Sequence, residues 1–349
     1  MLDKNIKVGD CLIGRNQRPF TIAEMSGNHN QSLERALSIV DAAAEAGADA
    51  IKLQTYTADT MTIKGAHTIS EKSSLWYGQE LHDLYKMAYT PWEWHTEIFK
   101  RAKSRGLIAF SSPFDSTAVD FLETLNVPLY KVASFENTDH PLLKRIAKTG
   151  KPVIMSTGVS TISDIYESVK VLKQNGCNEL VLLKCTSTYP STPENTNLLT
   201  IPLLQQIFSN CVIGLSDHTM GIGAAIAAVG LGARVIEKHF TLRRADGGVD
   251  SAFSMEPHEF KMLTVESKTA FLALGHPELG VTQVEEPSIK YKRSIYVSAP
   301  IARGEVFTEQ NIRVVRPGNG LPPKFFETIL GKHANRNYEP GIPLSWDIL

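Results

Sequence analysis

Residues 212–240 read VIGLSDHTMGIGAAIAAVGLGARVIEKHF, in which two short apolar runs each end in ionisable side chains. His218 closes the first run and His239 closes the second. The Gly- and Ala-rich segment near 221–232 predicts a helix that packs tightly on a sheet. A strand, a crossover helix and a parallel strand place both strand ends on the same edge of the sheet. We therefore expect His218 and His239 to emerge side by side.

These two histidines are candidate ligands for a divalent metal. Neutral imidazole is the commonest side-chain metal ligand near neutral pH. An isolated histidine at a loop is more often held by structural hydrogen bonds. Here each histidine comes with an acid, Asp217 or Glu237, and both lie at equivalent places in a repeated unit, which favours the metal site.

Charge and cysteine usage exclude several classes of protein. The chain has 349 residues, and its 36 basic residues nearly balance its 37 acidic ones, which argues against binding to nucleic acid or an anionic membrane. The 4 cysteines show no CxxC spacing and are typical of reduced thiols in a cytosolic protein. The first residues lack the apolar core of a signal peptide, and no apolar run approaches the roughly 20 residues of a membrane span. We expect a cytoplasmic protein.

Strand-then-helix units recur before and after this stretch. Buried strands are predicted at 19–25, 50–56, 107–112, 128–134, 152–157 and 180–186, besides the two strands in 212–240. Helices are predicted at 31–46, 92–105, 115–125, 139–149, 161–175, 200–209 and 256–274. Eight units in about 275 residues predict a (β/α)₈ TIM barrel. No GxGxxG follows the first strand, so a dinucleotide-binding sheet is disfavoured.

The barrel is expected to end near residue 275, and the remainder has a different character. Residues 276–287 contain Pro, Gly and paired acids and are typical of a linker. Residues 288–349 have short β-type runs and frequent turn signals, which predict a small β-rich domain.

The carboxyl ends of the predicted strands carry polar residues, and active sites of TIM barrels lie on that face. Four cations are expected on this rim: Lys52, Lys131, Lys184 and Lys238. The expected acids are Glu24, Glu136, Asp217 and Glu237. The expected hydroxyls are Ser111, Ser112, Ser134, Ser156, Thr157, Thr186, Ser187 and Ser216. Lysines and hydroxyls around a cleft favour an anionic, phosphate-bearing substrate. The inserts 57–90 and 241–255 are expected to overhang this mouth.

Two chemistries are compatible with these residues. A metal beside a phosphate-binding rim favours a reaction in which a carbonyl is polarised or a water is activated. A Schiff base on Lys131 or Lys184 is the other route. Cys185 is interpreted as a packing residue.

Six motifs resemble the signatures of the sialic acid synthases. They are AEMSGNHN at 23–30, IKLQT at 51–55, YKVAS at 130–134, MSTG at 155–158, GLSDH at 214–218 and EKHF at 237–240. The tail motif VRPGNG at 315–320 resembles the antifreeze-like (SAF) domain of the same family. The resemblance covers nearly the whole chain and implies a TIM barrel followed by that domain.

Members of this family condense phosphoenolpyruvate with an open-chain amino sugar, using a divalent metal, Mn²⁺ or Mg²⁺. The resemblance implies that His218 and His239 hold the metal. The residues implied for phosphoenolpyruvate are Lys52, Lys131, Ser112, Ser134, Ser156, Ser187 and Ser216, with Lys184 expected on the same rim. Those implied for the sugar are Glu24, Gln54, Tyr189 and Asp250, with Glu24 as the candidate for proton transfer. Arg316 is implied to reach a partner's barrel in a domain-swapped homodimer.

Two further motifs, YTPWEW at 89–94 and ADGGVDSAFS at 245–254, resemble the pseudaminic acid synthase subgroup. The implied acceptor is 2,4-diacetamido-2,4,6-trideoxy-L-altrose, whose methyl surface is expected to pack against Trp76, Tyr77, Trp92 and Trp94. The alternatives are an N-acetylneuraminate or legionaminate synthase. A remote alternative is a carbohydrate- or ice-binding protein with an inert barrel, but the many arginines of the tail disfavour ice binding.

Overall fold

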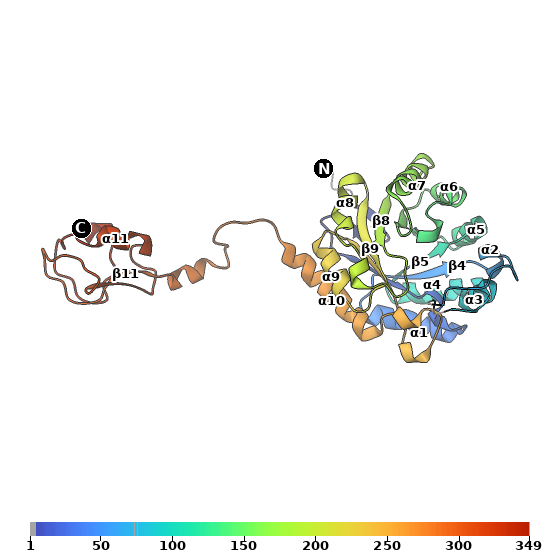
Figure 1. Cartoon of the computed structure of the whole chain (residues 1–349), viewed down its shortest axis with the longest axis horizontal. Helices are drawn as coiled ribbons and strands as arrows, with labels where there is room; N and C mark the ends of the chain where they lie inside the picture. The colour runs from blue at the N-terminus through green and yellow to red at the C-terminus, as the bar shows by residue number, and fades with distance from the viewer. Residues whose placement is uncertain (1–4, 73, 75, 349) are drawn as a thin grey trace. The chain divides into compact units, whose positions relative to one another are not determined.

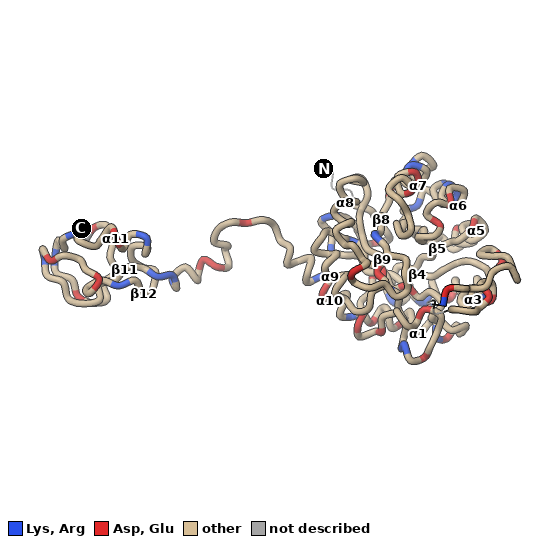
Figure 2. The backbone as a smooth tube through the Cα atoms, viewed as in Figure 1, with Lys and Arg blue, Asp and Glu red and all other residues tan. Residues whose placement is uncertain are grey.

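The computed structural model describes residues 5–72, 74 and 76–348, and the chain divides into two compact units (Figure 1). The first unit is Met1–Gly275 and the second is His276–Leu349. Basic and acidic residues both occur along the helices of the first unit (Figure 2). No helix among the described residues is long and apolar enough to cross a membrane.

The first unit is the predicted TIM barrel, which is confirmed. Eight parallel strands close in the order β10-β3-β4-β5-β6-β7-β8-β9. They are β3 (Phe20–Glu24), β4 (Ala50–Thr55), β5 (Ile108–Pro113), β6 (Tyr130–Val132), β7 (Val153–Ser156), β8 (Leu180–Cys185), β9 (Val212–Asp217) and β10 (Val235–His239). The register pairs His239 with Glu24 and Glu24 with Lys52, so these strand ends lie next to one another.

Helices surround the barrel because the outward faces of the strands are apolar. They are α1 (Leu33–Glu45), α4 (His95–Ser104), α5 (Ser116–Thr124), α6 (His140–Ala147), α7 (Ile162–Gln174), α8 (Thr200–Ile207), α9 (Gly223–Gly230) and α10 (Pro257–Leu274). Side-chain N-caps start several of them, since Ser32, Asp115, Asp139 and Thr161 each accept from a backbone N–H of the first turn.

An antiparallel hairpin closes the amino-terminal end of the barrel, where the sequence suggested only a short leader. It consists of β1 (Ile6–Val8) and β2 (Cys11–Ile13). Ile6, Val8 and Ile13 are buried with inward-facing residues of the strands such as Phe20 and Phe110. The apolar plug leaves the polar residues of the barrel interior at the opposite, carboxyl-terminal end.

Short elements shape the loops at that carboxyl-terminal end. The insert 57–90 contains α2 (Ala58–Met61) and α3 (Leu81–Ala88), which lie together beside β4 (Figure 1). The 3₁₀ turns are η1 (Ser26–His29), η2 (Trp92–Trp94), η3 (Ser134–Glu136), η4 (Pro193–Asn195), η5 (Arg244–Asp246) and η6 (Ser251–Phe253).

The second unit has its own small core. After η7 (Glu286–Tyr291), strand β11 (Ser294–Val297) pairs antiparallel with β12 (Ile312–Val315). The remaining elements are η8 (Pro323–Phe325), α11 (Phe326–Ile329) and η9 (Trp346–Ile348). Ile295, Phe307, Ile312 and Tyr338 are buried among other apolar residues of this unit.

Candidate active site

Four charged side chains form a buried network inside the barrel mouth. Side chains alternate in and out along a strand, so Glu24, Lys52, Lys131 and Glu237 point inward from four different strands. Lys52 Nζ lies 2.6 Å from Glu24 Oε2 and 3.5 Å from Glu237 Oε1, while Lys131 Nζ lies 3.1 Å from Glu237 Oε1. All four side chains are at most 6% exposed. We call these four residues the quartet.

Burial and ion pairing shift the pKa values of the quartet in opposite directions. Burial raises the pKa of Glu24, and the nearby Lys52 offsets only part of this effect. Burial also penalises the charged form of Glu237, but Lys131 and Lys52 outweigh it and lower the pKa of that carboxyl. Burial lowers the pKa of the Lys131 ammonium, against the attraction of Glu237. Glu24 is therefore the carboxyl of the quartet that takes up a proton more readily.

Small hydroxyl residues line the mouth beside the quartet. Ser112 accepts from Lys52 Nζ at 3.3 Å, and Ser216 donates to Glu237 Oε1 at 3.4 Å. Ser134 accepts from the Gly158 backbone N–H at 3.2 Å. Gly158 has no room for a side chain, because a Cβ there would overlap the hydroxyls of Ser187 and Ser134. This close approach brings hydroxyls from two loops to one place.

Ser156 belongs to the same group of hydroxyls. Its Oγ is buried and has no hydrogen-bond partner among the residues that the structure describes. An unsatisfied buried hydroxyl is costly. An anionic oxygen bound beside it would satisfy it.

The two candidate metal ligands lie together as the sequence predicted. The ring centroids of His218 and His239 are 5.4 Å apart, and the ring of Tyr189 lies 4.4 Å from that of His218. His218 Nδ1 lies 2.9 Å from the Thr186 carbonyl oxygen, an arrangement that fixes its orientation. Burial holds the pKa of His239 well below its usual value, so this imidazole is neutral.

The histidines fit a divalent metal, because the His239 Nδ1 atom is buried and the described part of the chain offers it no hydrogen-bond partner. Within the part of the chain that the structure describes, no group of three or more His, Cys, Asp or Glu is placed to hold a metal ion. The protein would therefore supply two nitrogen ligands, and oxygens of substrate or water would complete the coordination.

A cavity of about 390 Å³ opens beside these groups. The lining residues that carry polar groups are Gln54, Ser74, Glu136, Ser187, Tyr189, His239 and Asp250, together with the aromatic residues Tyr56, Trp76 and Tyr85. Gln54 donates to Glu24 Oε1 at 2.9 Å and so connects the cavity to the quartet. Glu136 Oε2 is enclosed without a hydrogen-bond partner in the described ranges 5–72, 74 and 76–348, and burial raises the pKa of Glu136 to about 7. Burial likewise raises the pKa of Asp250 to about 6.

The insert 241–255, which carries Asp250, is tied to the barrel by side chains. Asn28 donates to the Phe240 carbonyl at 2.9 Å and to Ser254 Oγ at 2.8 Å. Arg35 donates to the Asn28 carbonyl at 2.8 Å and pairs with Asp246 at 2.9 Å. These contacts fix the position of Asp250 relative to Gly27, whose N–H lies 3.4 Å from Asp250 Oδ2.

Several residues expected on the rim lie elsewhere, because they occupy outward-facing positions of their strands. Lys238 Nζ is buried against Asp217 at 2.9 Å and donates to the carbonyls of Thr219 and Gly221. Ser111 hydrogen-bonds to Thr55, which also contacts His95. The expectation that Lys238, Asp217 and Ser111 face the mouth is wrong.

Lys184 also occupies an outward-facing position, between the inward-facing Leu183 and Cys185. Its Nζ donates to Thr186 Oγ1, and the nearby charge of Asp217 acts on it. The structure therefore does not bring Lys184 to the quartet. Cys185, expected only to pack, faces the interior with its sulfur 3.6 Å from Ser187 Oγ.

The aromatic residues around the cavity differ from those expected. Trp76 lines it and donates to the Val249 carbonyl. Trp92 instead stacks on Phe121, and Trp94 packs edge-on against His29. Tyr77 is largely exposed to solvent. The aromatic lining comes mainly from residues that the sequence analysis did not single out, namely Tyr56, Tyr85, Phe114 and Phe135. Of these, Tyr56 and Phe114 directly follow strands, and this position in the sequence could have identified them as residues of the barrel mouth.

Arg316 lies in the second unit and is exposed directly after β12. The turn that follows it is held by Ser294, whose hydroxyl donates to the Pro317 carbonyl and accepts from Gly320 N–H. The side chain is therefore presented from an ordered turn.

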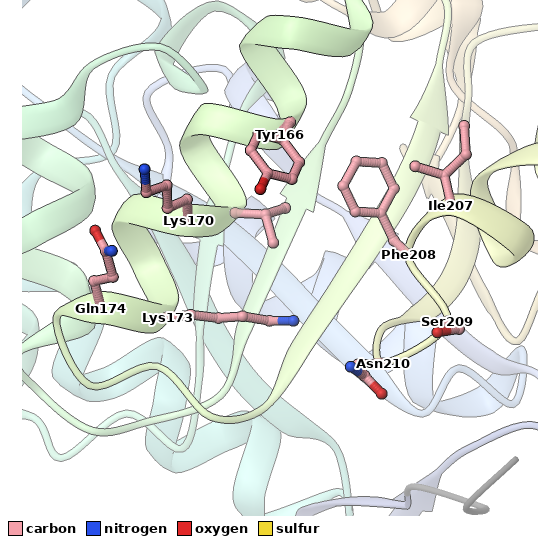
Figure 3. A pocket seen from close by; sticks show the side chains of 9 residues that line it. Tyr166, Lys170, Lys173, Gln174, Ile207, Phe208, Ser209 and Asn210 are labelled. Atoms are coloured by element: carbon pink, nitrogen blue, oxygen red, sulfur yellow. The ribbon is translucent and has the colours of Figure 1, made fainter.

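A second hollow, of about 360 Å³, lies between α7 and the end of α8 (Figure 3). Tyr166, Lys170, Lys173, Ile207 and Phe208 are among its lining residues. It contains none of the predicted site residues.

Known proteins resemble both parts of this chain. Residues 39–278 match the model of the NeuB family, and residues 292–349 match that of the SAF domain. The chain is 43% identical to a pseudaminic acid synthase of Campylobacter jejuni over 94% of this chain and 96% of that protein. It is 42% identical to a pseudaminic acid synthase of Helicobacter pylori, over 95% and 98%. A crystal structure of N-acetylneuraminic acid synthetase from Leptospira borgpetersenii, in complex with citrate, superposes with a TM-score of 0.75 at 32% identity, covering 83% of this chain and 96% of that one.

Proposed function

The chain belongs to the NeuB family, and from this premise we propose that it is a pseudaminic acid synthase. It condenses phosphoenolpyruvate with 2,4-diacetamido-2,4,6-trideoxy-L-altrose, with C–O cleavage, and releases pseudaminic acid and phosphate. The observation that carries the proposal is the buried quartet beside a cavity that is lined by both polar and apolar side chains.

Phosphoenolpyruvate binds at the quartet. Lys52 and Lys131 supply the cations, and Ser112, Ser134, Ser156, Ser187 and Ser216 supply hydroxyls around them. Support comes from the unsatisfied Ser156 hydroxyl and from the close approach of Ser134 and Ser187 at Gly158. Charge-assisted hydrogen bonds in a dry site are the usual means of holding phosphate and carboxylate groups.

A divalent metal, Mn²⁺ or Mg²⁺, is held by His218 and His239. When bound, it supplies Lewis-acid polarisation of the sugar aldehyde. The neutral state of His239 and its unpartnered Nδ1 support this assignment. Asp250 and Tyr189 face the sugar from the adjoining wall of the cavity.

Two carboxyl groups transfer protons in the proposed reaction. Glu24, whose pKa is raised by burial, protonates the oxygen of the former aldehyde after carbon–carbon bond formation. Glu136 accepts a proton from the water that adds at the second carbon of the phosphoenolpyruvate unit. A pKa of about 7 and an oxygen without a protein partner suit a general base near neutral pH.

The decisive experiment for the reaction is mass spectrometry of products formed from phosphoenolpyruvate with each candidate sugar. We expect pseudaminic acid from the diacetamido trideoxy sugar, loss of activity with chelator and recovery with Mn²⁺. Preference for N-acetylmannosamine or for the legionaminate precursor would replace the pseudaminate assignment and keep the synthase chemistry. Activity in chelator together with borohydride trapping of Lys131 would favour the Schiff-base route. The absence of any product would revive a non-enzymatic, carbohydrate-binding role.

The second unit also takes part, in a cytoplasmic homodimer with exchanged C-terminal domains. The linker 276–287 reaches about 40 Å at roughly 3.3 Å per residue, which is enough to cross to a neighbouring barrel. Arg316 then hydrogen-bonds an acetamido carbonyl of the sugar in the partner's site. Its exposure on an ordered turn supports this role.

The test of the exchange mixes an Arg316→Ala chain with a Glu24→Ala chain, each inactive alone. Exchanged dimers regain one complete site out of two, because one barrel receives both intact residues. Confirmed heterodimers without recovered activity would show that the second unit serves its own barrel or none.

A further inference from the structure

One loop at the barrel mouth lies against the hydroxyls that we propose bind phosphoenolpyruvate. It is the segment 157–161 between β7 and α7, which we call the β7–α7 loop. It begins directly after Ser156, whose hydroxyl is buried. Gly158 of this loop lies so close to Ser134 and Ser187 that a Cβ there would overlap their hydroxyls. The path of this backbone therefore determines how closely the three hydroxyls approach one another.

The β7–α7 loop contains a strained backbone conformation. Val159 has a φ of 49°, in the left-handed region that β-branched residues rarely adopt. Its side chain is 70% exposed, so packing of the valine does not account for this conformation. Such a conformation persists only where the surrounding contacts hold it in place. The contacts that flank Val159 are therefore the ones that shape the loop.

Asn137 supplies contacts on both sides of Val159. This side chain follows η3 and is buried. Its Nδ2 donates to the Gly158 carbonyl at 3.3 Å and to Ser160 Oγ at 2.5 Å. It also lies 3.2 Å from the Ser156 carbonyl oxygen. Two of these partners are carbonyl oxygens, which only accept, so the amide nitrogen of Asn137 must be the atom that faces the loop.

Asn137 is itself fixed between the two loops that it joins. Its backbone carbonyl accepts from Ser168 Oγ of α7, the helix that follows the β7–α7 loop. On its other side the chain continues into η3, where Ser134 accepts from the Gly158 N–H at 3.2 Å. Asn137 is not among the residues that line the cavity. Any effect of Asn137 on a ligand must therefore pass through the loop.

We infer that Asn137 is a positioning residue, which holds the β7–α7 loop in its strained form and thereby assembles the hydroxyl groups that bind phosphoenolpyruvate. The inference rests on the proposed function, because that function names the ligand of these hydroxyls. Without the Asn137 amide, Val159 relaxes toward an ordinary backbone conformation, and Gly158 withdraws from Ser134 and Ser187. A displacement of about 1 Å in a binding group costs up to roughly a hundredfold.

The test is calorimetric titration of the full-length, Mn²⁺-loaded protein with phosphoenolpyruvate in the absence of sugar, followed by steady-state kinetics. Asn137→Ala should raise the Kd and the KM for phosphoenolpyruvate at least about tenfold, while the KM for the sugar stays within about twofold. Asn175→Ala is the matched control. The Asn175 amide also donates to a backbone carbonyl, that of Val171 at 2.8 Å, but at the C-terminal end of α7. This control should bind phosphoenolpyruvate as the wild type does.

Two further variants separate positioning from a general loss of stability. Ser160→Ala removes one acceptor of the Asn137 amide at a half-buried position, and should raise the Kd for phosphoenolpyruvate about threefold. Val159→Gly removes the strain, because glycine adopts the left-handed region freely. Added to Asn137→Ala, it should restore at least about threefold of the lost affinity, which loss of stability alone would not produce.

The outcomes distinguish this inference from the proposed function. Wild-type affinity for phosphoenolpyruvate in folded Asn137→Ala and Ser160→Ala overturns the inference alone. The same conclusion follows if Val159→Gly restores nothing, because the loss would then not come from released strain at residue 159. A wild-type protein that does not bind phosphoenolpyruvate would refute the proposed function, and the inference would fall with it.

Discussion

Replacing the proposed base Glu136 by Gln should abolish most activity and yet stabilise the folded protein at neutral and alkaline pH. The carboxyl lines the cavity, and its Oε2 is enclosed with no hydrogen-bond partner among the described residues, so the folded state penalises its ionised form. Burial raises its pKa from the ordinary 4.5 to about 7. Between these values the folded state binds the proton more tightly than the unfolded chain does. This group therefore lowers stability as the pH rises through that window.

The size of the effect follows from the two pKa values. One pKa unit corresponds to about 1.36 kcal/mol, so the shift corresponds to roughly 3 kcal/mol at pH 8. At pH 5, where the unfolded carboxyl is only partly ionised and the folded one is protonated, the penalty is below about 1 kcal/mol. Water that reaches the exposed part of the side chain reduces both figures. Glutamine has nearly the same shape and no charge to desolvate, so the variant escapes the pH-dependent penalty.

The assay is urea denaturation of the wild type and of Glu136→Gln at pH 5 and pH 8, followed by far-UV circular dichroism. The variant should gain about 1–3 kcal/mol relative to the wild type on going from pH 5 to pH 8. Glu167→Gln, on the exposed face of α7, controls for the loss of one charge. In parallel, wild-type kcat/KM should rise with pH through about 7, and the variant should lose roughly a hundredfold or more. Parallel stability profiles, or a wild type that is the more stable protein at pH 8, would refute the account of Glu136.

Three further outcomes follow from the contacts at the barrel mouth. Lys238→Met leaves Asp217 buried without its cation and should lower the unfolding free energy by roughly 3–5 kcal/mol, measured in urea. Arg35→Ala removes the ties to Asp246 and the Asn28 carbonyl, and should raise the KM for the sugar about tenfold while leaving that for phosphoenolpyruvate unchanged. His239→Ala should weaken Mn²⁺ binding in calorimetry at least about tenfold, and unchanged affinity would exclude His239 as a ligand.

The barrel could be predicted because its signal is repeated and local. Each strand is apolar in its body and polar at its carboxyl end, and Glu24 and Lys52 are brought together simply because adjacent parallel strands end on one edge. The pairing of His218 with His239 followed from the same rule. These inferences needed only the order of the strands and the direction of the chain.

The sequence did not reveal which alternate residues of each strand face the barrel interior. Side chains reverse direction at every residue, so Glu237 and Lys238 look equivalent in sequence but point to opposite faces of the sheet. Lys238 therefore pairs with Asp217 on the outward face of the strands, where both side chains are buried. Lys184 likewise occupies an outward-facing position. The prediction that Trp92 and Trp94 line the cavity was wrong for a different reason. Trp92 and Trp94 directly follow the insert that was expected at the mouth, but their rings pack against Phe121 and His29. Only the three-dimensional packing determines these contacts.

The neutrality of the quartet explains how binding of the first substrate would prepare the site for the second. Two carboxylates and two ammonium groups cancel, so the dry interior tolerates all four charges while each is paired. Phosphoenolpyruvate bound at the quartet, as proposed, would bring several negative charges and would compete for the N–H groups of Lys52 and Lys131. Each ammonium has only three, so bonds donated to the phosphate are withdrawn from Glu24 and Glu237. Glu24, whose pKa burial has already raised, is the carboxyl that takes up a proton in response. Glu24 would then hold that proton next to Gln54, on the side where the sugar aldehyde becomes an alkoxide. Because the site would be ready to protonate the alkoxide only after this step, the arrangement favours binding of phosphoenolpyruvate before the sugar.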